Sequence, residues 1–372
     1  MQLTIDYRQQ PNERQVGGKF AKQADLIAAG LPVPRFVCLT RDFYTEVTRP
    51  IQGALREVLH AIDFNRHQSI LQGSDQAQAL ISGLELTREQ QNTILGSFDG
   101  LFAMDTLVSV RASTVGHKLE ESEDSLANPF AGMSESFLYV RRDQILQRVK
   151  QCWASGFSQE SLIYRQQQQM DLMGFSVAVG IQAMVFGERS FVLFTADPKT
   201  AAADKIIIAG HGIGEGVVQE KVAVDHYFIS GKTAAITHTI ADKTSQLVFN
   251  ESDGYGLTET VVAPALQNAP CLTDAEIRQL VEAGSKVEAL YGLPQDIEGT
   301  FTADGTFYLL QTRPIALDFD RQLVWSNTNV TESYPGISST LTFTHAKYFY
   351  RIIFRDLYQR LSVSNEQIWS NY

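Results

Sequence analysis

The sequence predicts an α+β protein that folds into more than one compact unit. Helical and strand-like patterns alternate over the first part of the chain, and a strand-rich block follows at residues 175–229. The length of 372 residues exceeds the usual size of one domain, so we expect two or three units with separate cores. A hydrophobic content of 44% with 20% charged residues is typical of globular proteins and excludes the disordered and fibrous classes.

Capping boxes mark two of the expected helices, because Gln90 follows Thr87 by three residues and Glu276 follows Thr273 at the same spacing. Apolar residues at helical spacing indicate the others. The expected helices cover residues 19–29, 42–62, 87 onward, 143–154, 159–170 and 273–291. The expected strands cover residues 36–39, 106–111, 175–185, 190–196, 205–209 and 217–229.

A polar, acidic segment at residues 113–136 interrupts this pattern. It contains Gly116, Pro129 and Gly132, and it is too long and irregular for a simple connection between packed elements. Loops of this kind inside a compact domain are usually either functional or disordered, and composition alone leaves both alternatives open.

The net charge of −11 argues against a nucleic-acid-binding face, which would need clustered Lys and Arg side chains. A smaller polyanion would need a few cations gathered in one pocket. The three cysteines are far apart and predict neither disulfides nor a zinc site. No targeting signal is evident, and the longest apolar stretch, residues 175–186, is too short for a membrane span. We therefore expect a cytoplasmic protein with no nucleic-acid or membrane partner.

Asp304 and Gly305 join two strand-like runs and give the strongest hairpin signal in the sequence. If they are the central residues of a type I′ turn, the residue numbers of every cross-strand pair have the same sum. In that register Glu298 faces Gln311. The next pair on the same face is Asp296 with Arg313.

These hairpin side chains could form a magnesium polyphosphate site. Mg²⁺ prefers hard oxygen ligands and usually keeps waters and phosphate oxygens, so Glu298 and Gln311 would be sufficient protein ligands. Arg313 would complement a phosphate oxygen with its forked donors. The hairpin alone, however, favours the simpler interpretation of an edge hairpin with a solvated polar face.

A set of segments in a fixed order favours the magnesium polyphosphate site over the solvated hairpin. They are residues 17–19 (GGK), 28–34 (AAGLPVP), 108–113 (VSVRAS), 130–137 (FAGMSESF), 180–185 (GIQAMV), 194–198 (FTADP), 212–215 (GIGE), 294–298 (PQDIE) and 310–315 (LQTRPI). Together they resemble the opening domain of the phosphoenolpyruvate synthase and pyruvate, phosphate dikinase family. The resemblance covers roughly residues 15–315 and implies an ATP-grasp fold, in which two lobes clamp ATP.

The resemblance also implies site residues, with ATP and Mg²⁺ as cofactors. Lys19, Arg111 and Arg313 would neutralise the phosphates and are also the expected catalytic residues. Gln182 would hold adenine, and Gly132 and Ser136 would cover the phosphates. Glu298 and Gln311 would bind Mg²⁺. Physical arguments favour two of these roles. Lys19 follows a Gly-Gly lead into a helix N-terminus, and Arg111 ends a strand beside a long loop.

Three departures from the family pattern bear on the phosphate loops. Phe20 follows the lysine where the family commonly has a fuller glycine turn, residues 113–118 replace a small and acidic run, and Met133 stands where glutamine is common. The expected lobes are residues 1–185 and 186–318. Residues 325–330 (WSNTNV), 334–336 (YPG) and 341–342 (LT) resemble the start of a second, acceptor-substrate domain in rifampicin-phosphotransferase-like and phosphoenolpyruvate-synthase-like proteins. Residues 319–372 are therefore expected to be a truncated part of that domain.

The implied function is an ATP-dependent phosphotransferase that splits ATP and passes a phosphoryl group through a histidine to a small-molecule acceptor. No segment like the family's phospho-acceptor surrounds any of the seven histidines. That histidine is therefore expected downstream in a longer protein or on a partner chain. The alternatives are an ATP-driven condensing ligase of the prodigiosin-synthase type and a non-catalytic nucleotide-binding module.

Overall fold

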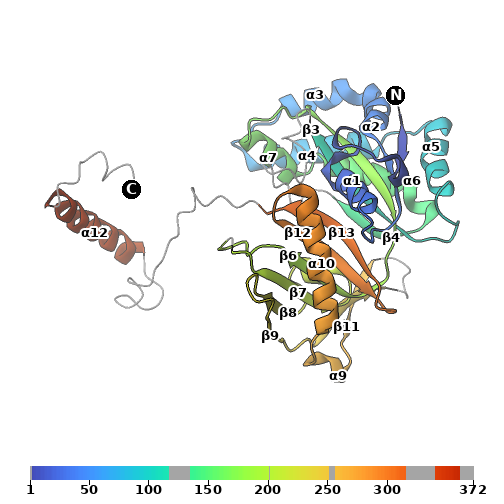
Figure 1. Ribbon diagram of the computed structural model, residues 1–372. Coiled ribbons are helices and arrows are strands. Elements are labelled where there is room, and N and C mark those ends of the chain that lie inside the picture. Colours follow the sequence, from blue (N-terminus) through green and yellow to red (C-terminus); the bar gives the residue numbers. More distant parts are fainter. Residues whose placement is uncertain (1, 117–134, 201, 251–255, 316–339, 361–372) are drawn as a thin grey trace. The chain divides into compact units, whose positions relative to one another are not determined.

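The computed structural model describes residues 2–116, 135–200, 202–250, 256–315 and 340–360. The chain divides into two compact units, Met1–Leu317 and Asp318–Tyr372, each of which is described by itself. Within the described residues, the first unit contains two large antiparallel sheets with flanking helices, which confirms the expected α+β class (Figure 1). No described helix is both long and apolar enough to cross a membrane.

The first sheet has the strand order β1-β2-β5-β3-β4, and its neighbouring strands are antiparallel. Its strands are β1 (Thr4–Asp6), β2 (Phe36–Leu39), β3 (Val108–Gly116), β4 (Ser136–Val140) and β5 (Phe175–Ala183). The central strand β5 is buried along almost its whole length. Its continuous apolar sequence is typical of a strand that is covered on both faces.

Helices cover both faces of this sheet. Along β2, Val37 and Leu39 join one core while Phe36 and Cys38 join another, because successive side chains of a strand point to opposite faces. The second core is closed by α1 (Glu13–Ala28). The first core is covered by α2 (Arg41–Thr48), α3 (Gln52–His60), α4 (His67–Ser82), α5 (Arg88–Asp99), α6 (Ile145–Ser155) and α7 (Gln159–Gln167).

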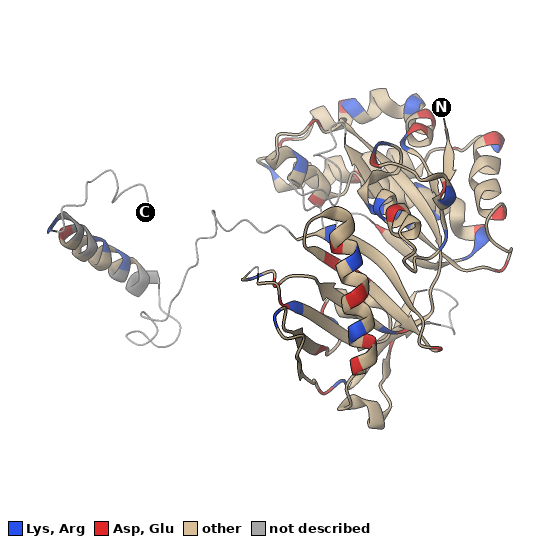
Figure 2. Cartoon of the chain, viewed as in Figure 1, with Lys and Arg blue, Asp and Glu red and all other residues tan. Residues whose placement is uncertain are grey.

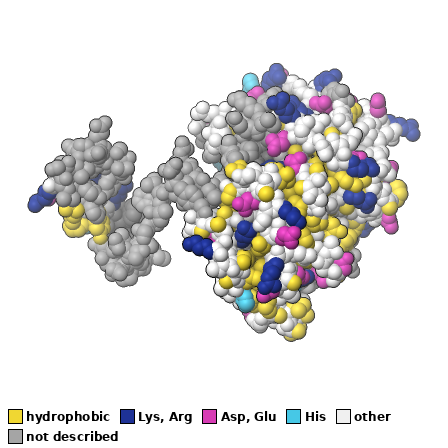
Figure 3. All heavy atoms as spheres, viewed as in Figure 1, with side chains coloured by type: hydrophobic (Ala, Val, Ile, Leu, Met, Phe, Trp, Pro, Cys, Tyr) yellow, Lys and Arg dark blue, Asp and Glu magenta, His cyan; other side chains and the backbone are white. Residues whose placement is uncertain are grey.

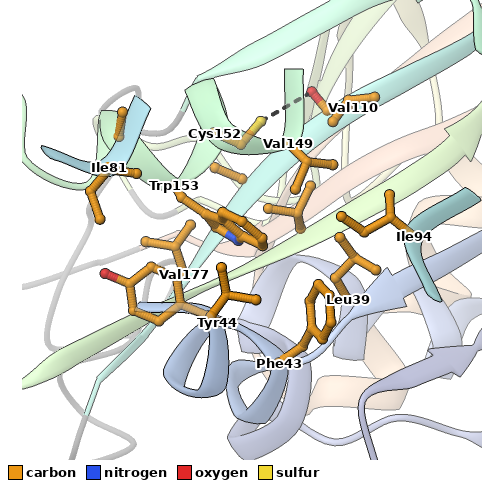
Figure 4. Packing of buried hydrophobic residues seen from close by; sticks show 14 of the residues in the cluster. Leu39, Phe43, Tyr44, Ile81, Ile94, Val110, Val149, Cys152, Trp153 and Val177 are labelled. Atoms are coloured by element: carbon orange, nitrogen blue, oxygen red, sulfur yellow. Dashed lines mark hydrogen bonds between the residues drawn. The ribbon is translucent and has the colours of Figure 1, made fainter. Parts of the chain in front are cut away.

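Trp153 of α6 lies at the centre of the larger core (Figure 4). Its ring centroid is 6.0 Å from that of Phe43 and 6.1 Å from that of Tyr44, both on α2. The neighbouring Cys152 thiol contacts the backbone oxygen of Val110 on β3 at 3.6 Å. These contacts fix α2 and α6 on the sheet and thereby hold β3, which contributes Ser109 and Arg111 to the pocket described below.

Gly180 on β5 lets α1 approach the sheet closely. A Cβ at this position would overlap the ring of Phe20, which is fully buried. Gly180→Ala is therefore expected to lower the free energy of unfolding by about 1–3 kcal/mol through overpacking. Gly96→Ala in α5 is the matched control, because nothing lies within 4 Å of its added methyl. Urea unfolding should leave that variant at least as stable as wild type, and equal midpoints for the two variants would contradict this packing.

The second sheet has the strand order β13-β12-β6-β7-β8-β9 and is also antiparallel. Its strands are β6 (Gly187–Phe194), β7 (Lys205–His211), β8 (Asp225–Ile229), β9 (Ile236–Thr239), β12 (Gln295–Thr302) and β13 (Phe307–Pro314). The hairpin of β12 and β13 lies at one edge, where contacts with α1 join it to the first sheet.

Helix α10 (Asp274–Tyr291) packs on this second sheet. It begins at the predicted capping box, in which the Thr273 hydroxyl accepts from the Glu276 amide at 3.3 Å and the Thr273 amide donates to Glu276 Oε2 at 2.8 Å. Charged residues recur along this helix (Figure 2), and Arg278, Glu282 and Lys286 are exposed. Leu26 of α1 belongs to the same core as the buried side of α10, so α1 contributes to the cores of both lobes.

The expected strand at residues 217–229 is wrong in its first half. The chain forms a short helix, α8 (Gly214–Val218), and the strand β8 begins only at Asp225. Gly212 has φ 86° and turns the chain there, and its amide donates to the Glu188 oxygen at 2.7 Å. A separate hairpin of β10 (Ser245–Phe249) and β11 (Leu257–Val261) follows, and then α9 (Pro264–Gln267).

Apolar side chains are exposed near the end of this lobe. Val261 of β11 and Leu266 of α9 are 76% and 47% exposed, and Figure 3 shows hydrophobic atoms in the corresponding region. The second unit contains α12 (Thr340–Arg360), which exposes Tyr348, Phe349, Ile352, Ile353 and Leu357.

Candidate functional site

A pocket of about 870 Å³ is lined by residues from both sheets of the first unit. This volume is within the range of small-molecule and cofactor sites. Its lining includes Ser109 and Arg111 of β3, Ser136 of β4, Gln182 of β5, Glu298 of β12 and Leu310 of β13. Four residues predicted from the sequence therefore share one cavity.

The turn of the β12–β13 hairpin differs from the expected type I′ turn. Gly305 has φ 81°, but Asp304 is not among the residues with positive φ, as a type I′ turn would require. The Thr302 amide instead donates to the Thr306 oxygen at 2.9 Å across a three-residue loop. The Asp304 carboxylate stabilises this loop by accepting from the Thr306 amide at 3.0 Å and the Thr302 hydroxyl at 2.6 Å.

A bulge restores the predicted pairing beyond the turn. The residues paired nearest the loop are Phe301 with Phe307, Thr300 with Tyr308 and Gly299 with Leu309. Leu310 is then left out of the register, so Glu298 faces Gln311 and Asp296 faces Arg313, as predicted. The expected neighbours are correct, but they arise from two irregularities that compensate each other.

The bulge leaves the Leu310 carbonyl available to the first lobe. It accepts from Gln23 Nε2 of α1 at 2.7 Å and from Arg111 Nη1 of β3 at 3.1 Å. Arg111 Nη2 donates to Gln311 Oε1 at 2.9 Å. A guanidinium carried by one sheet is thus held on a main-chain oxygen and an amide oxygen of the other.

Arg313 and Asp296 form a two-donor ion pair across the hairpin. Both Nε and Nη2 of Arg313 lie 2.7 Å from Asp296 Oδ2. Burial raises the pKa of Asp296, an effect that Arg313 opposes. The other oxygen, Oδ1, is buried and has no hydrogen-bond partner among the described residues. This orphaned oxygen suits a site that also receives a cation or an ordered water.

Glu298 faces Gln311 across the hairpin, and the predicted cations influence its pKa. Burial raises the pKa of Glu298, and nearby Asp296 raises it further. Arg111, Arg313 and Lys19 act in the opposite direction and favour the ionised form. No residue that the structure describes donates a hydrogen bond to this carboxylate. A cationic ligand would therefore relieve the burial of its charge.

Lys19 lies in the buried part of α1 and is only 4% exposed. Its Nζ donates to the Ala112 carbonyl at 3.0 Å, on the residue that follows Arg111. The helix is interrupted just before it, because Gly17 has φ 75° and an added Cβ there would overlap Ser113. The predicted glycine lead thus allows the start of this segment to approach β3 closely.

The remaining predicted residues are placed as follows. The Gln182 side chain is 2% exposed, and its Nε2 donates to Gln23 Oε1 at 2.5 Å and to the Pro34 oxygen at 3.2 Å. Ser136 is exposed at the pocket and pairs with Arg111 in the β3–β4 ladder. Gly132 lies outside the described residues.

The oxygen ligands offered by the hairpin fit an Mg²⁺ ion that is also bound by nucleotide phosphates. In the part of the chain that the structure describes, no group of three or more His, Cys, Asp or Glu residues could hold a metal. Glu298 and Gln311 offer one carboxylate and one amide oxygen in register. Mg²⁺ usually binds one or two protein groups and completes its shell with waters and phosphate oxygens, so the pair suits a nucleotide-bound ion.

Sequence reasoning missed Gln23. This fully buried residue contacts Leu310 and Gln182, and it lies four residues after Lys19, on the same side of α1. The helical spacing from Lys19 was the available signal. Nothing in the sequence showed that its partner would be a carbonyl 287 residues away.

Two α+β lobes with a pocket between their sheets, lined by Arg111, Gln182 and Glu298 among others, are typical of the ATP-grasp class of nucleotide-binding proteins. Residues 13–331 match the family described as "Pyruvate phosphate dikinase, AMP/ATP-binding domain". The chain therefore belongs to this family and contains its ATP-binding domain, and its ATP-grasp fold agrees with the sequence prediction.

Similar proteins include phosphoenolpyruvate synthases and a rifampicin phosphotransferase. A probable phosphoenolpyruvate synthase of Methanothermobacter thermautotrophicus is 32% identical over 308 residues, with 80% of this chain and 43% of the relative covered. The phosphoenolpyruvate synthase of Pyrococcus furiosus is 30% identical over 346 residues, covering 81% and 42%. The rifampicin phosphotransferase of Bacillus cereus is 32% identical over 306 residues, covering 81% and 34%. The matched region thus spans less than half the length of each of these relatives.

Solved structures with a similar chain course include two nucleotide complexes. The ADP complex of N5-carboxyaminoimidazole ribonucleotide synthetase has a TM-score of 0.30 at 9% identity, covering 79% of this chain and 44% of that one. A biotin carboxylase ATP-analogue complex of Campylobacter jejuni has a TM-score of 0.28 at 10% identity, covering 80% and 41%. Scores this low carry no argument about the site.

Proposed function

We propose that this chain is the Mg-ATP-binding part of a phosphotransferase. It cleaves ATP and passes a phosphoryl group through a histidine on another domain, located downstream or on a partner chain, to a small-molecule acceptor. Residues 1–185 and 186–318 are the lobes that clamp the nucleotide, and residues 319–372 begin the acceptor-substrate domain. The reaction takes place in the cytoplasm.

The observation that carries the proposal is that Arg111 and Arg313 are held by Gln311 and Asp296 on the face of the β12–β13 hairpin that also carries Glu298. A transferring phosphoryl group develops charge on its equatorial oxygens, and fixed cations stabilise that charge without reorganisation. Arg111 and Arg313 supply forked donors for phosphate oxygens, whereas Lys19 supplies a single charge. Glu298 and Gln311 would hold Mg²⁺, which when bound would supply positive charge to neutralise the phosphate oxygens.

The remaining predicted residues complete the nucleotide site in this proposal. Gln182 with nearby backbone lies on the adenine side, and Gly132 and Ser136 close over the phosphates. Support for the placement of Gln182 and Ser136 is that both line the same pocket as Arg111 and Glu298. The placement of Gly132 rests on the resemblance alone.

The test follows the fate of the phosphate. The purified chain is incubated with Mg²⁺ and ATP labelled at the β or the γ position in separate reactions, together with the part of the Pyrococcus furiosus phosphoenolpyruvate synthase that lies outside the matched region. Transfer breaks a P–O bond of ATP and forms a P–N bond on histidine. The expected product is protein-bound label that is lost in acid but stable in base.

Other outcomes identify the alternatives. Label on a small molecule without a protein intermediate would favour the ligase. Nucleotide binding with no cleavage, even when the acceptor domain is present, would favour the non-catalytic module. Either result would overturn the proposed phosphotransferase.

A further inference from the structure

Gln23 is buried at the place where three elements of the two lobes meet. It lies on α1 and has no exposed surface. Its Nε2 donates to the Leu310 carbonyl of β13 at 2.7 Å, and its Oε1 accepts from Gln182 Nε2 of β5 at 2.5 Å. The amide nitrogen and the amide oxygen of Gln23 therefore each make a hydrogen bond, one to each lobe.

Both partners of Gln23 also contact Arg111. The guanidinium donates to the same Leu310 carbonyl at 3.1 Å, and its Nη1 lies 3.5 Å from Gln182 Oε1. A carbonyl oxygen has two lone pairs, so Gln23 and Arg111 can share it. Gln23 thus fixes the two acceptors that orient the guanidinium on its Nη1 side, while Nη2 reaches Gln311.

The bulge makes this arrangement possible. In a regular ladder the Leu310 position would pair with β12, but here the register passes from Leu309 to Gln311 without it. The Gln23 amide is a neutral donor to the oxygen that the bulge leaves unpaired. Removing that donor leaves Arg111 to satisfy the carbonyl alone and deprives the buried Gln182 amide of its short acceptor.

We infer that Gln23 is a positioning residue that aligns Arg111 with Gln311 before the nucleotide binds. This inference rests on the proposed function for its effect on Mg-ATP, but the alignment itself is a property of the ligand-free protein. Gln23 acts through Arg111, Gln182 and the bulge at Leu310. Its donor to Leu310 therefore controls how well the metal and phosphate groups are held, whereas its acceptor holds Gln182, the residue proposed for the adenine side.

The binding test compares Mg-ATP with adenosine by calorimetry. Gln23→Met keeps the size of the side chain without its polar ends, and Gln23→Glu keeps an acceptor for Gln182 but removes the donor to Leu310. Gln23→Glu is expected to weaken Mg-ATP binding about 10–100-fold, the usual effect of removing a support of a metal site. Its adenosine affinity should stay within about twofold of wild type, because the acceptor for Gln182 is kept. Gln23→Met loses both contacts and should weaken the binding of both ligands. Equal losses for both ligands in Gln23→Glu, or no loss, would overturn the inference.

The matched control is Tyr291→Phe. The Tyr291 hydroxyl also links α1 to the second lobe, by donating to the Lys22 carbonyl at 3.1 Å, but it does not touch the bulge. Tyr291→Phe should reduce thermal stability while leaving the ratio of Mg-ATP affinity to adenosine affinity unchanged. A similar change of that ratio in Tyr291→Phe would show that any weakened lobe contact has this effect.

A double-mutant cycle tests the alignment without nucleotide. Gln23→Met and Arg111→Ala share the Leu310 carbonyl and Gln182, so the stability loss of the double variant should be smaller than the sum of the single losses. Additive losses would overturn the inference even if Mg-ATP binds. If wild type binds no Mg-ATP but the cycle shows coupling, the proposed function fails while the alignment stands.

Discussion

Replacing Arg111 by alanine is expected to reduce phosphoryl transfer from Mg-ATP by about 10²–10³-fold, the usual cost of removing one preorganised charge donor. In the ligand-free structure this guanidinium binds the Leu310 carbonyl and Gln311 Oε1, and it favours the ionised form of Glu298. Its loss removes a phosphate-binding cation and a contact between the lobes together. Single-turnover transfer of labelled phosphate measures the effect.

Arg278→Ala is the matched control for this variant. Arg278 is an arginine on α10 whose side chain is 71% exposed and pairs with Asp274 at 3.6 Å. It should leave the transfer rate unchanged, since exposed ion pairs contribute little. A transfer rate of Arg111→Ala within threefold of wild type would show that phosphate stabilisation does not depend on this side chain.

Lys243→Met is expected to lower the free energy of unfolding by about 3–5 kcal/mol, because it leaves a buried charge without its partner. Lys243 Nζ lies 2.7 Å from Asp225 Oδ1, and both side chains are fully buried. The same carboxylate accepts from the Ala241 amide at 2.9 Å and the Cys271 amide at 2.7 Å. These fixed donors prevent Asp225 from moving toward water when the ammonium is removed.

Lys286→Met controls for the loss of a lysine as such. Its side chain is 59% exposed and pairs with Glu282 within α10. Guanidinium unfolding should place its midpoint at the wild-type value. A loss below about 1 kcal/mol for Lys243→Met would mean that the second lobe tolerates an unpaired Asp225, contrary to the usual cost of a broken buried pair.

The sequence predicted the polar face of the hairpin but not the way it forms. Glu298 and Gln311 were paired on the assumption of a two-residue turn, whereas the chain uses a three-residue loop and a bulge at Leu310. Loop geometry depends on local hydrogen bonds to Asp304, which the Asp-Gly signal does not specify. Pairing near the site was nevertheless correct because the two shifts cancel.

The parts that the sequence could not predict depend on contacts between distant segments. Phe20 departs from the family pattern, and only the structure shows that its ring packs on Gly180. Gln23 carries no charge and no motif, so its contact with Leu310 had no sequence signal beyond its spacing from Lys19. Arg111 does line the pocket, but the expected reason was wrong, because the strand predicted to end there continues to Gly116 and Arg111 lies within β3.

Glu298 is proposed to hold the metal of Mg-ATP between the lobes, and thermal unfolding of wild type and Glu298→Gln tests this role most directly. Burial raises the pKa of Glu298, so its ionised form is unfavourable in the folded state and a neutral isostere should not destabilise the ligand-free protein. At about 100 times Kd, Mg-ATP should add roughly 2.7 kcal/mol to wild type and raise its midpoint by a few degrees. If Glu298 holds the metal, this shift in the midpoint should require Mg²⁺ and should be smaller in Glu298→Gln. An absent shift in wild type, or one that is equal in the variant and independent of Mg²⁺, would contradict it.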